Sequence, residues 1–417
     1  MFELEKNNIQ EYLKEKFPQM DTSRPLAIYM LGEGSAEEDG DGYLNYIYRV
    51  GDGKMSIVLK QGRVHGRRGL TNTFVLPLDR NRLEYQAMKI RHSIVPEYVP
   101  GLYFYDEENR IMAMEDVSHL KVMRYQLNKN VVFPNFASQI AEYMAKSHFY
   151  TSEYYVDTKL FRDINVHFMN HEMRDVYDDM VFITKRDEGD RYGIPVGEAY
   201  MPFVERIILD PQVIRARYEL KHMYMSNAEV LVHADLHTSN IMISRDELKV
   251  IDMEYAFCGP LAYDMGYVQS NIMSQYITAA YRPFPSEKER ESFRKYCLDT
   301  MRDIFEEYCR VFFECWDRDA KPVYRKVEGI KEKIRADLLR DMIGFCATIS
   351  FARSAGPYMY PEYSELNDKS DVAKAVCISM VFDRASILKR DKYRDVQEWI
   401  DELVMVEELF RMVGTAV

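Results

Sequence analysis

The sequence predicts an α+β fold with two lobes, a small β-rich N-terminal lobe and a larger, mainly helical C-terminal lobe. Short apolar runs separated by glycine turns occur between about Asp39 and Asp116, whereas helical spacing of apolar residues prevails beyond that point. The chain has 417 residues, of which 47% are hydrophobic, and this is enough for more than one core. We therefore expect two domains, residues 1–116 with an N-terminal helix, and residues 117–417.

The N-terminal lobe is expected to begin with a helix and to continue as strands. The apolar face of that amphipathic helix carries Ile9, Tyr12 and Leu13. The runs Tyr46–Val50 and Ser56–Lys60 predict two strands, and the glycine turn between them indicates a hairpin. A helix is expected over Leu83–Ile90, which contains Glu84, and a further strand over Arg110–Glu115.

The C-terminal lobe is expected to be helical with one exception. Ile140–Ser147 has helical spacing. The tail has one apolar face, formed by Val396, Trp399, Ile400, Leu403 and Val404. The exception is the pair of runs Ile241–Ile243 and Leu248–Ile251, which predict a β-hairpin among helices.

Composition excludes several classes of protein. Apolar runs long enough for a membrane span are absent, and the first residues lack the apolar core of a signal peptide. The six cysteines form no CxxC pair, which in a chain of this length favours reduced thiols and a cytoplasmic location. The net charge of −12 argues against a general nucleic-acid binder. We expect a small-molecule substrate, and neither a nucleic acid nor a membrane as partner.

The most informative stretch contains four oxygen-bearing side chains. Asp235 and Asn240 lie five residues apart, and Asp252 and Glu254 follow at the end of an apolar run. Phosphoryl transfer needs clamped phosphates, a metal ion on them and a base that orients the acceptor hydroxyl. Asp235 is suited to be the base, and the oxygens of Asn240, Asp252 and Glu254 are suited to Mg²⁺.

This stretch has two other interpretations. One is a His- and Asp-rich turn with ordinary caps. The other is a zinc site at His233 and His237, which are four residues apart. The metalloprotease pattern requires Glu directly after the first His, and Ala234 stands there, so we expect His233 to be a packed, hydrogen-bonded residue that shapes the loop.

The N-terminal lobe contains features that suit a nucleotide. The glycine turn Asp39–Asn45 precedes a strand, and such turns let backbone amides approach phosphates. Lys60 ends the next strand, and Glu84 lies on a helix; kinases hold a phosphate-binding lysine with a glutamate in this way. The backbone of the segment Met114–Val117 could hydrogen-bond an adenine ring, although it could equally be a plain connection between lobes.

Two charged residues lie further along the chain. Asp264 could brace the loop around Asp235 by accepting backbone hydrogen bonds, which is a structural role. Arg353 stands in the apolar stretch Ile349–Gly356, where an arginine is costly to bury unless it is paired or contacts a ligand. A core ion pair and a ligand contact both remain open for Arg353.

Together these residues resemble the aminoglycoside phosphotransferase/choline kinase superfamily and, within it, the methylthioribose kinase family. The similar segments keep their order and spacing over most of residues 40–266. They are Gly40–Asn45, Lys60–Gln61, Leu76–Arg80 with Glu84, Met114–Ser118, His233–Thr238, and Asp252–Phe257 with Gly259–Pro260. The resemblance implies a protein-kinase-like bilobal fold, in which the N-terminal lobe binds ATP, and ATP-dependent phosphorylation of the C1 hydroxyl of methylthioribose in methionine salvage.

The resemblance also implies a role for each matching residue. Asn45 and Lys60, with Glu84, would serve the ATP phosphates, and Asp235 would be the base that touches the substrate. The other implied roles are adenine binding by the backbone of Glu115, Asp116 and Val117, Mg²⁺–ATP binding by Asp252, Met253 and Glu254, and substrate binding by Arg353. The family further suggests a homodimer.

The chain departs from the family at three positions. Ala234 replaces the usual loop glycine, which is expected to restrict the local backbone. Asn240 replaces the serine of methylthioribose kinases and restores the general superfamily form. Ala352 stands where that family has the first of two adjacent arginines, which opens the question of which sugar is bound.

We therefore expect a cytoplasmic small-molecule kinase that uses ATP and Mg²⁺, with 5-methylthioribose as the preferred acceptor. The first alternative is a kinase of another hydroxyl-bearing metabolite, such as an aminoglycoside, a choline-like amino alcohol or a different sugar. The second alternative is a catalytically inactive nucleotide-binding module, although the sequence retains the base, the metal ligands and the phosphate lysine.

Overall fold

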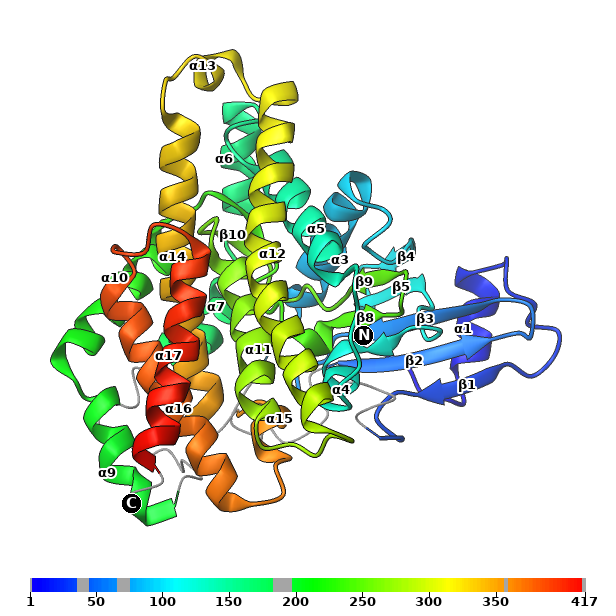
Figure 1. Ribbon diagram of the computed structural model, residues 1–417. Helices are drawn as coiled ribbons and strands as arrows, with labels where there is room; N and C mark the ends of the chain where they lie inside the picture. The colour runs from blue at the N-terminus through cyan, green and yellow to red at the C-terminus, as the bar shows by residue number, and fades with distance from the viewer. Residues whose placement is uncertain (1, 36–44, 66–75, 183–196, 356–358, 415–417) are drawn as a thin grey trace. The chain divides into compact units, whose positions relative to one another are not determined.

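A computed structural model describes residues 2–35, 45–65, 76–182, 197–355 and 359–414 (Figure 1). A five-stranded antiparallel sheet near the start of the chain is followed by a mainly helical remainder, which confirms the α+β class. The chain divides into two compact units, which we describe separately. The first unit contains Met1–Tyr125, Asn170–Met173 and Thr238–Ala256, and the second contains Gln126–Met169, Arg174–His237 and Phe257–Val417.

The first unit is built on a sheet with the strand order β1-β2-β3-β5-β4, in which every neighbouring pair is antiparallel. The strands are β1 (Ala27–Met30), β2 (Tyr46–Gly51), β3 (Ser56–Gln61), β4 (Leu102–Asp106) and β5 (Ile111–Glu115). The hairpin of β2 and β3 and the strand β5 match the predictions from sequence. Strand β1 was not predicted, because its residues precede the region where alternation becomes clear.

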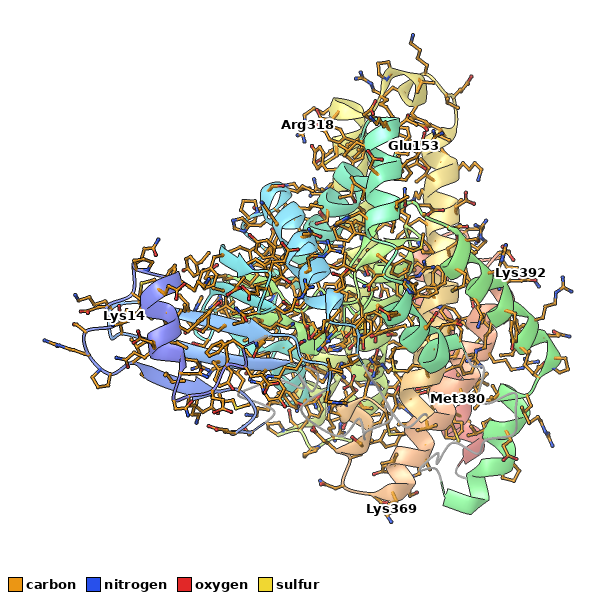
Figure 2. All side chains as sticks on the ribbon, turned by 180° about the vertical axis from the view of Figure 1, so that it is seen from behind. Lys14, Glu153, Arg318, Lys369, Met380 and Lys392 are labelled. Atoms are coloured by element: carbon orange, nitrogen blue, oxygen red, sulfur yellow. The ribbon has the colours of Figure 1, made fainter. Side chains whose placement is uncertain are left out.

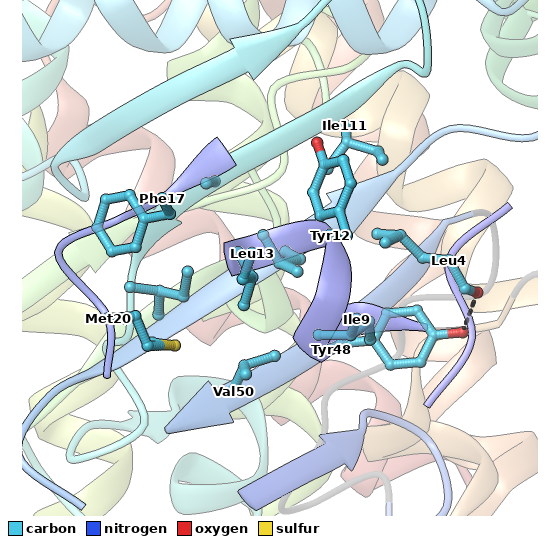
Figure 3. Packing of buried hydrophobic residues seen from close by; sticks show 12 residues of the cluster. Leu4, Ile9, Tyr12, Leu13, Phe17, Met20, Tyr48, Val50 and Ile111 are labelled. Atoms are coloured by element: carbon cyan, nitrogen blue, oxygen red, sulfur yellow. Dashed lines mark hydrogen bonds between the residues drawn. The ribbon is translucent and has the colours of Figure 1, made fainter. Parts of the chain in front are cut away.

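The helix α1 (Ile9–Lys16) covers one face of this sheet (Figures 1 and 3). As predicted, Ile9, Tyr12 and Leu13 are its buried residues. The sheet residues in the same cluster are Tyr48, Val50, Ile57, Leu59, Ile111 and Ala113. The hydroxyl of Tyr48 donates a hydrogen bond of 2.8 Å to the carbonyl of Leu4, which ties the segment before α1 to the sheet (Figure 3).

The other face of the sheet carries Lys60. Side chains alternate between the faces of a strand, so Lys60 points away from the cluster that contains its neighbour Leu59. The helix α3 (Asp79–Ile94) supplies Glu84 to this face, where the two side chains form an ion pair. The predicted helix over Leu83–Ile90 is therefore present, and it is longer at both ends.

A small three-stranded sheet completes the first unit. Its strands are β6 (Lys121–Val122), β8 (Ile241–Ile243) and β9 (Leu248–Val250), in the order β6-β8-β9, with the 3-10 turn η2 (Thr238–Asn240) before β8. The predicted hairpin of β8 and β9 is present, and its pairing with β6 explains why residues 238–256 pack with the first unit. The compact unit thus differs from the expected division at residue 116.

The second unit is mainly helical. Its elements are α5 (Phe136–Thr151), α6 (Thr158–His167), the π-helical turn η1 (Asp178–Phe182), α9 (Gly197–Ile208), α10 (Pro211–Ser226), α11 (Tyr263–Ala279), α12 (Glu287–Asp319), α13 (Pro322–Arg325), α14 (Ile330–Ala355), α15 (Pro361–Ser364), α16 (Lys369–Lys389), α17 (Val396–Gly414) and the paired strands β7 (Val230–Val232) and β10 (Phe257–Gly259). Two helices, α4 (Met123–Asn128) and α7 (His171–Tyr177), contain residues of both units.

The core of the second unit surrounds α11, all of whose residues are buried. Helices α12 and α14 both pack against α11, and α12 lies beside α5. A Cβ at Gly266 would lie 2.8 Å from the Cβ of Phe345, so the close approach of α11 and α14 requires glycine there. In the tail, four of the five predicted face residues are buried, and Val404 is half-buried.

Two further observations concern the described residues as a whole. None of their helices combines the length and the apolar character that crossing a membrane would require. All six cysteines are buried, and none forms a disulfide.

Candidate active site

In the first unit, Lys60 is held between two carboxylates. Its Nζ lies 2.6 Å from Oε1 of Glu84 and 2.5 Å from Oδ1 of Asp252. The Lys60 and Glu84 side chains are almost completely buried, whereas that of Asp252 is 25% exposed. The predicted pairing of strand lysine and helix glutamate is therefore present in the structure, and Asp252 joins it from the end of β9.

Three carboxylates meet at this point. One oxygen from each of Glu84, Asp252 and Glu254 lies within 4.8 Å of the others. Asp252 has a φ of 65°, so the chain turns sharply directly after the apolar strand, in a conformation that Asp tolerates better than most residues. Oxygen ligands gathered in this way suit a hard divalent cation such as Mg²⁺.

The cluster has more acidic than basic groups. Lys60 and Arg80 are its cationic side chains, and Nε of Arg80 lies 3.1 Å from Oε2 of Glu254. If all groups are ionised, three carboxylates face two cations. Burial raises the pKa of Glu84 to about 8 and also raises the pKa of Glu254, with Asp252 adding repulsion in both cases. A bound cation would relieve this excess of negative charge, so the donor set fits a metal ion.

Asn45 lies next to the same cluster. Its amide donates a hydrogen bond of 2.9 Å to Glu254 and accepts one of 3.1 Å from Arg80. Asn45 is the only residue of the predicted glycine turn Asp39–Asn45 that belongs to the described residues, so the expected contact of that turn with phosphates lies outside them.

A cavity of about 410 Å³ opens on the Lys60 face of the sheet. Its walls include Ile47 and Val58 from the sheet, together with Ile251. The predicted site residues that line it are Lys60, Glu115, Asp116, Val117, Asn240 and Asp252. A largely apolar cavity with a lysine and a carboxylate in its wall is typical of a nucleotide-binding pocket.

Some of the hydrogen-bonding groups of the segment Glu115–Val117 are already used within the protein. The N–H of Glu115 donates to the carbonyl of Gly101 at 2.8 Å. The side chain of Asp116 accepts from the hydroxyl of Ser56 at 2.6 Å and from the N–H of Ser118 at 3.0 Å. A donor to an adenine ring would therefore come from the N–H of Asp116 or Val117 rather than from Glu115.

Four predicted cofactor residues do not line this cavity. Glu84, Asn45 and Glu254 belong to the buried cluster behind Lys60. Met253 is fully buried, and its sulfur lies 3.6 Å from Nη1 of Arg91. Direct contact of these side chains with a cofactor stays a prediction.

In the second unit, hydrogen bonds to the side chain of Asp264 hold the loop around Asp235. Asp264 accepts hydrogen bonds from the backbone N–H groups of His233, at 2.7 Å, and Ala234, at 2.8 Å. His148 in turn contacts Asp264 at 3.2 Å. His233 is fully buried, and its Nδ1 accepts from the N–H of Asp235 at 3.2 Å. The structural roles expected for Asp264 and His233 are therefore confirmed.

Several donors converge on Oδ1 of Asp235. The hydroxyl of Tyr177 donates to it, Nε2 of His237 lies at 3.4 Å, and Nη2 of Arg353 lies at 3.7 Å. Burial opposes the ionisation of Asp235, but His237, Arg353 and Tyr177 outweigh it and hold the pKa well below its usual range. Asp235 is therefore an anion at neutral pH, as a base that accepts a proton must be.

Arg353 is paired within this site. Its guanidinium donates to the hydroxyl of Tyr267 from Nη2 at 2.7 Å, and it lies 5.3 Å from the ring centre of Tyr360. The ion-pair interpretation of Arg353 is thus correct, with Asp235 as the partner, and contact with a substrate stays a prediction.

Sequence reasoning did not identify Tyr177, Tyr267 and Arg80 as site residues. Tyr267 follows the Tyr263–Gly266 motif by one residue, and Arg80 ends a segment of the family resemblance, so both had a signal. Tyr177 precedes a π-helical turn and has no motif that a single sequence reveals.

The sequence of this chain is similar to those of known phosphotransferases. The profile of the Phosphotransferase enzyme family matches residues 202–291. A methylthioribose kinase from Geobacillus sp. (strain WCH70) is 29% identical over 366 residues, which cover 87% of this chain and 88% of the relative. A methylthioribose kinase from Erwinia tasmaniensis is 27% identical over 367 residues, which cover 88% and 91%.

Two solved kinase structures also align with this chain. A glucosamine kinase in complex with glucosamine, ADP and inorganic phosphate aligns with a TM-score of 0.47 and 11% identity, covering all of this chain and 89% of that one. A choline kinase from Cryptosporidium parvum aligns with a TM-score of 0.44 and 11% identity, covering 98% and 97%.

Proposed function

We propose that this chain, which is a phosphotransferase acting on a small-molecule hydroxyl, is an ATP-dependent kinase of 5-methylthioribose or a closely similar sugar. The observation that carries the phosphoryl-transfer assignment is Lys60, held between Glu84 and Asp252 on the wall of a cavity. The choice of sugar is supported by the methylthioribose kinases that match most of the chain.

In this proposal the first unit binds the nucleotide. Lys60 contacts the phosphates, and the N–H groups of Asp116 and Val117 face the adenine. Asp252 and Glu254 would hold Mg²⁺, with Asn240 as a further oxygen ligand. When bound, the metal ion offsets charge on the transferring phosphoryl group. Glu84 keeps Lys60 extended toward the cavity, so its charge is already in place when the reaction begins.

The second unit binds the acceptor. Asp235 accepts a hydrogen bond from the acceptor hydroxyl and takes its proton as the oxygen attacks the γ-phosphorus, while the bond from that phosphorus to the bridging oxygen breaks and ADP leaves. Because its pKa is held low, Asp235 orients the hydroxyl in the ground state and receives the proton late, when the P–O bond has largely formed. Arg353, whose Nη2 lies 3.7 Å from Oδ1 of Asp235, provides donors that would hold other oxygens of a sugar.

A panel of acceptors tests the proposed substrate. ADP release is measured by a coupled assay with methylthioribose, ribose, choline and kanamycin at equal concentrations. Methylthioribose is expected to give the highest kcat/KM. Equal or faster turnover of another member of the panel would reject methylthioribose as the preferred substrate. It would favour the alternative hypothesis of a kinase for a different hydroxyl compound.

The role of Asp235 is tested with the Asp235→Asn variant. Loss of a positioned base is expected to lower kcat by roughly 10²- to 10⁴-fold, whereas nucleotide binding through the first unit should persist. Thermal stabilisation by ATP and Mg²⁺ measures that binding. A variant that keeps most of its turnover would eliminate Asp235 as the base. Nucleotide binding by the wild-type protein without ADP release for any acceptor would point to an inactive module instead.

A further inference from the structure

The hydroxyl of Tyr177 is the donor in closest contact with the proposed base. It donates to Oδ1 of Asp235, the same oxygen that His237 and Arg353 approach. A carboxylate oxygen that receives several donors is stabilised as an anion and is a poor proton acceptor. The arrangement therefore fixes one oxygen of Asp235, and with it the orientation of the carboxylate that acts as the base.

Tyr177 is itself fixed by a second hydroxyl. Its oxygen lies 3.1 Å from the hydroxyl of Tyr267, which accepts hydrogen bonds from Nε and Nη2 of Arg353 at 3.2 and 2.7 Å. Tyr177 is 1% exposed, and Tyr267 is fully buried. A chain of hydrogen bonds thus runs from Asp235 through both tyrosines to Arg353, whose Nη2 also lies 3.7 Å from Oδ1 of Asp235.

The backbone that carries Tyr177 is anchored as well. Tyr177 ends α7, and the next five residues form the π-helical turn η1, a feature that occurs often at functional sites. Helix α10 holds this turn through Lys221, whose Nζ lies 2.6 Å from Oδ2 of Asp178, and through Arg217, which donates to the carbonyl of Val181 at 3.2 Å. The ring of Phe182 packs against Tyr224. The position of the Tyr177 hydroxyl is therefore set by the fold.

We propose that Tyr177 is a positioning residue for phosphoryl transfer: it anchors Oδ1 of Asp235 and so fixes the orientation in which this carboxylate meets the acceptor hydroxyl. This inference rests on the proposed function, because it assigns the base role to Asp235. It adds a residue from outside the sequence motifs. It also predicts that Tyr177 contributes to kcat rather than to binding, since an oriented base acts mainly in the transition state.

The test compares Tyr177→Phe with Tyr224→Phe. Tyr224 is equally buried, and its hydroxyl has no hydrogen-bond partner within the part of the chain that the structure describes. Loss of one hydrogen bond to a charged group is expected to lower kcat of Tyr177→Phe by roughly 10- to 100-fold, with the KM values for ATP and acceptor nearly unchanged. Tyr224→Phe should keep the wild-type kcat.

The pH profile separates positioning from a merely structural role. Tyr177 helps to hold the pKa of Asp235 low, so its removal should move the acid limb of kcat/KM to higher pH, by about one pH unit. Tyr267→Phe, which keeps Tyr177 but removes its support, should shift the limb in the same direction by less. A Tyr177→Phe enzyme with wild-type kcat and an unmoved acid limb would overturn the proposal.

A direct titration keeps this inference independent of the substrate. The carboxyl carbon of Asp235 is identified in ¹³C NMR spectra by its loss in Asp235→Asn, and its pKa is compared between wild type and Tyr177→Phe. A raised pKa in Tyr177→Phe supports the anchoring contact, and an unchanged pKa contradicts it. Absence of turnover in the wild-type protein would reject the proposed function. The titration would then still decide whether Tyr177 holds the pKa of Asp235 low.

Discussion

At the scale of single residues, Ala234 is under backbone strain. Its φ of 69° lies in the left-handed region, which is costly for a residue with a Cβ. The hydrogen bonds that its N–H and that of His233 donate to Asp264 keep it there. The loop next to the base therefore holds a backbone conformation that glycine would adopt at a lower free-energy cost than alanine.

Ala234→Gly is expected to stabilise the protein. Removing the strain of a left-handed alanine raises the free energy of unfolding by roughly 1–2 kcal/mol. The greater conformational entropy of glycine in the unfolded chain offsets part of this, so the expected net stabilisation is about 0.5–1 kcal/mol. Urea unfolding followed by circular dichroism measures the change. The control Ala141→Gly, at a buried position inside α5, should instead destabilise the protein. A loss of stability in Ala234→Gly would contradict the strain argument.

The sequence could predict the site residues that stand in motifs. The sequence predicts the pairing of Lys60 with Glu84 and, separately, a metal-ligand role for Asp252, and the structure brings the three side chains together. Tyr177 could not be predicted, because a hydrogen bond between residues 58 positions apart leaves no spacing pattern in one sequence. Met253 is fully buried, with its sulfur 3.6 Å from Nη1 of Arg91, and its expected contact with a cofactor stays a prediction.

At the scale of secondary-structure elements, the contact of α11 with α14 positions the loop around Asp235. Asp264, which braces that loop, stands in the first turn of α11. Two residues later, Gly266 lets α14 approach, because a Cβ there would lie 2.9 Å from the backbone nitrogen of Cys346 and 3.0 Å from the carbonyl oxygen of Met342. The backbone atoms of α14 cannot move independently of the helix.

Gly266→Ala is expected to destabilise the protein by about 1–3 kcal/mol, because the two helices must separate to admit the methyl group. The midpoint of urea unfolding measures the loss. Gly51→Ala is a suitable control: its nearest neighbour would be 3.4 Å away, and we expect a change within about 0.5 kcal/mol. Equal effects of the two substitutions would show that helix packing is not the cause.

Elements with a regular apolar period were predictable, and short or irregular ones were not. The hairpins β2–β3 and β8–β9 and the helices α1 and α17 agree with the patterns in the sequence. The strands β6, β7 and β10 pair with segments that are distant in the sequence, so no hairpin turn marks them. The turn η1 depends on its anchoring by α10, which a local pattern cannot reveal.

At the scale of the whole molecule, stability should depend on a buried acid outside the site. Asp383 lies on α16, whose course is marked by the labels of Lys369 and Met380 in Figure 2, and it is fully buried. Burial raises its pKa well above the ordinary value of 3.8, and Ser350 and Arg217 offset only part of this effect. The folded protein therefore binds a proton at Asp383 more tightly than the unfolded chain does.

The sign of the pH dependence follows from this shift. The stability that protonated Asp383 contributes is fully present below its ordinary pKa and is lost as the pH rises through the pKa of the folded state. Asp383→Asn keeps a neutral side chain at every pH. Its free energy of unfolding should exceed that of the wild type by a margin that grows as the pH rises from 5 to 9.

Urea unfolding at pH 5, 7 and 9 checks this prediction. Asp401→Asn, at an exposed position of α17, controls for the removal of one negative charge from a protein of net charge −12. Parallel stability curves for Asp383→Asn and the wild type would contradict the argument, because they would mean that Asp383 has the same proton affinity in both states.

The burial of all six cysteines makes this protein convenient for site-specific spectroscopy. Maleimide and nitroxide reagents attack exposed thiolates, and burial raises the pKa of Cys297, Cys309 and Cys377 to about 12. A single cysteine introduced at an exposed lysine, such as Lys14 or Lys392, would then be the one position that takes up the label (Figure 2). Fluorescence or spin-label signals could thus be collected from the otherwise unaltered chain while nucleotide and acceptor are added.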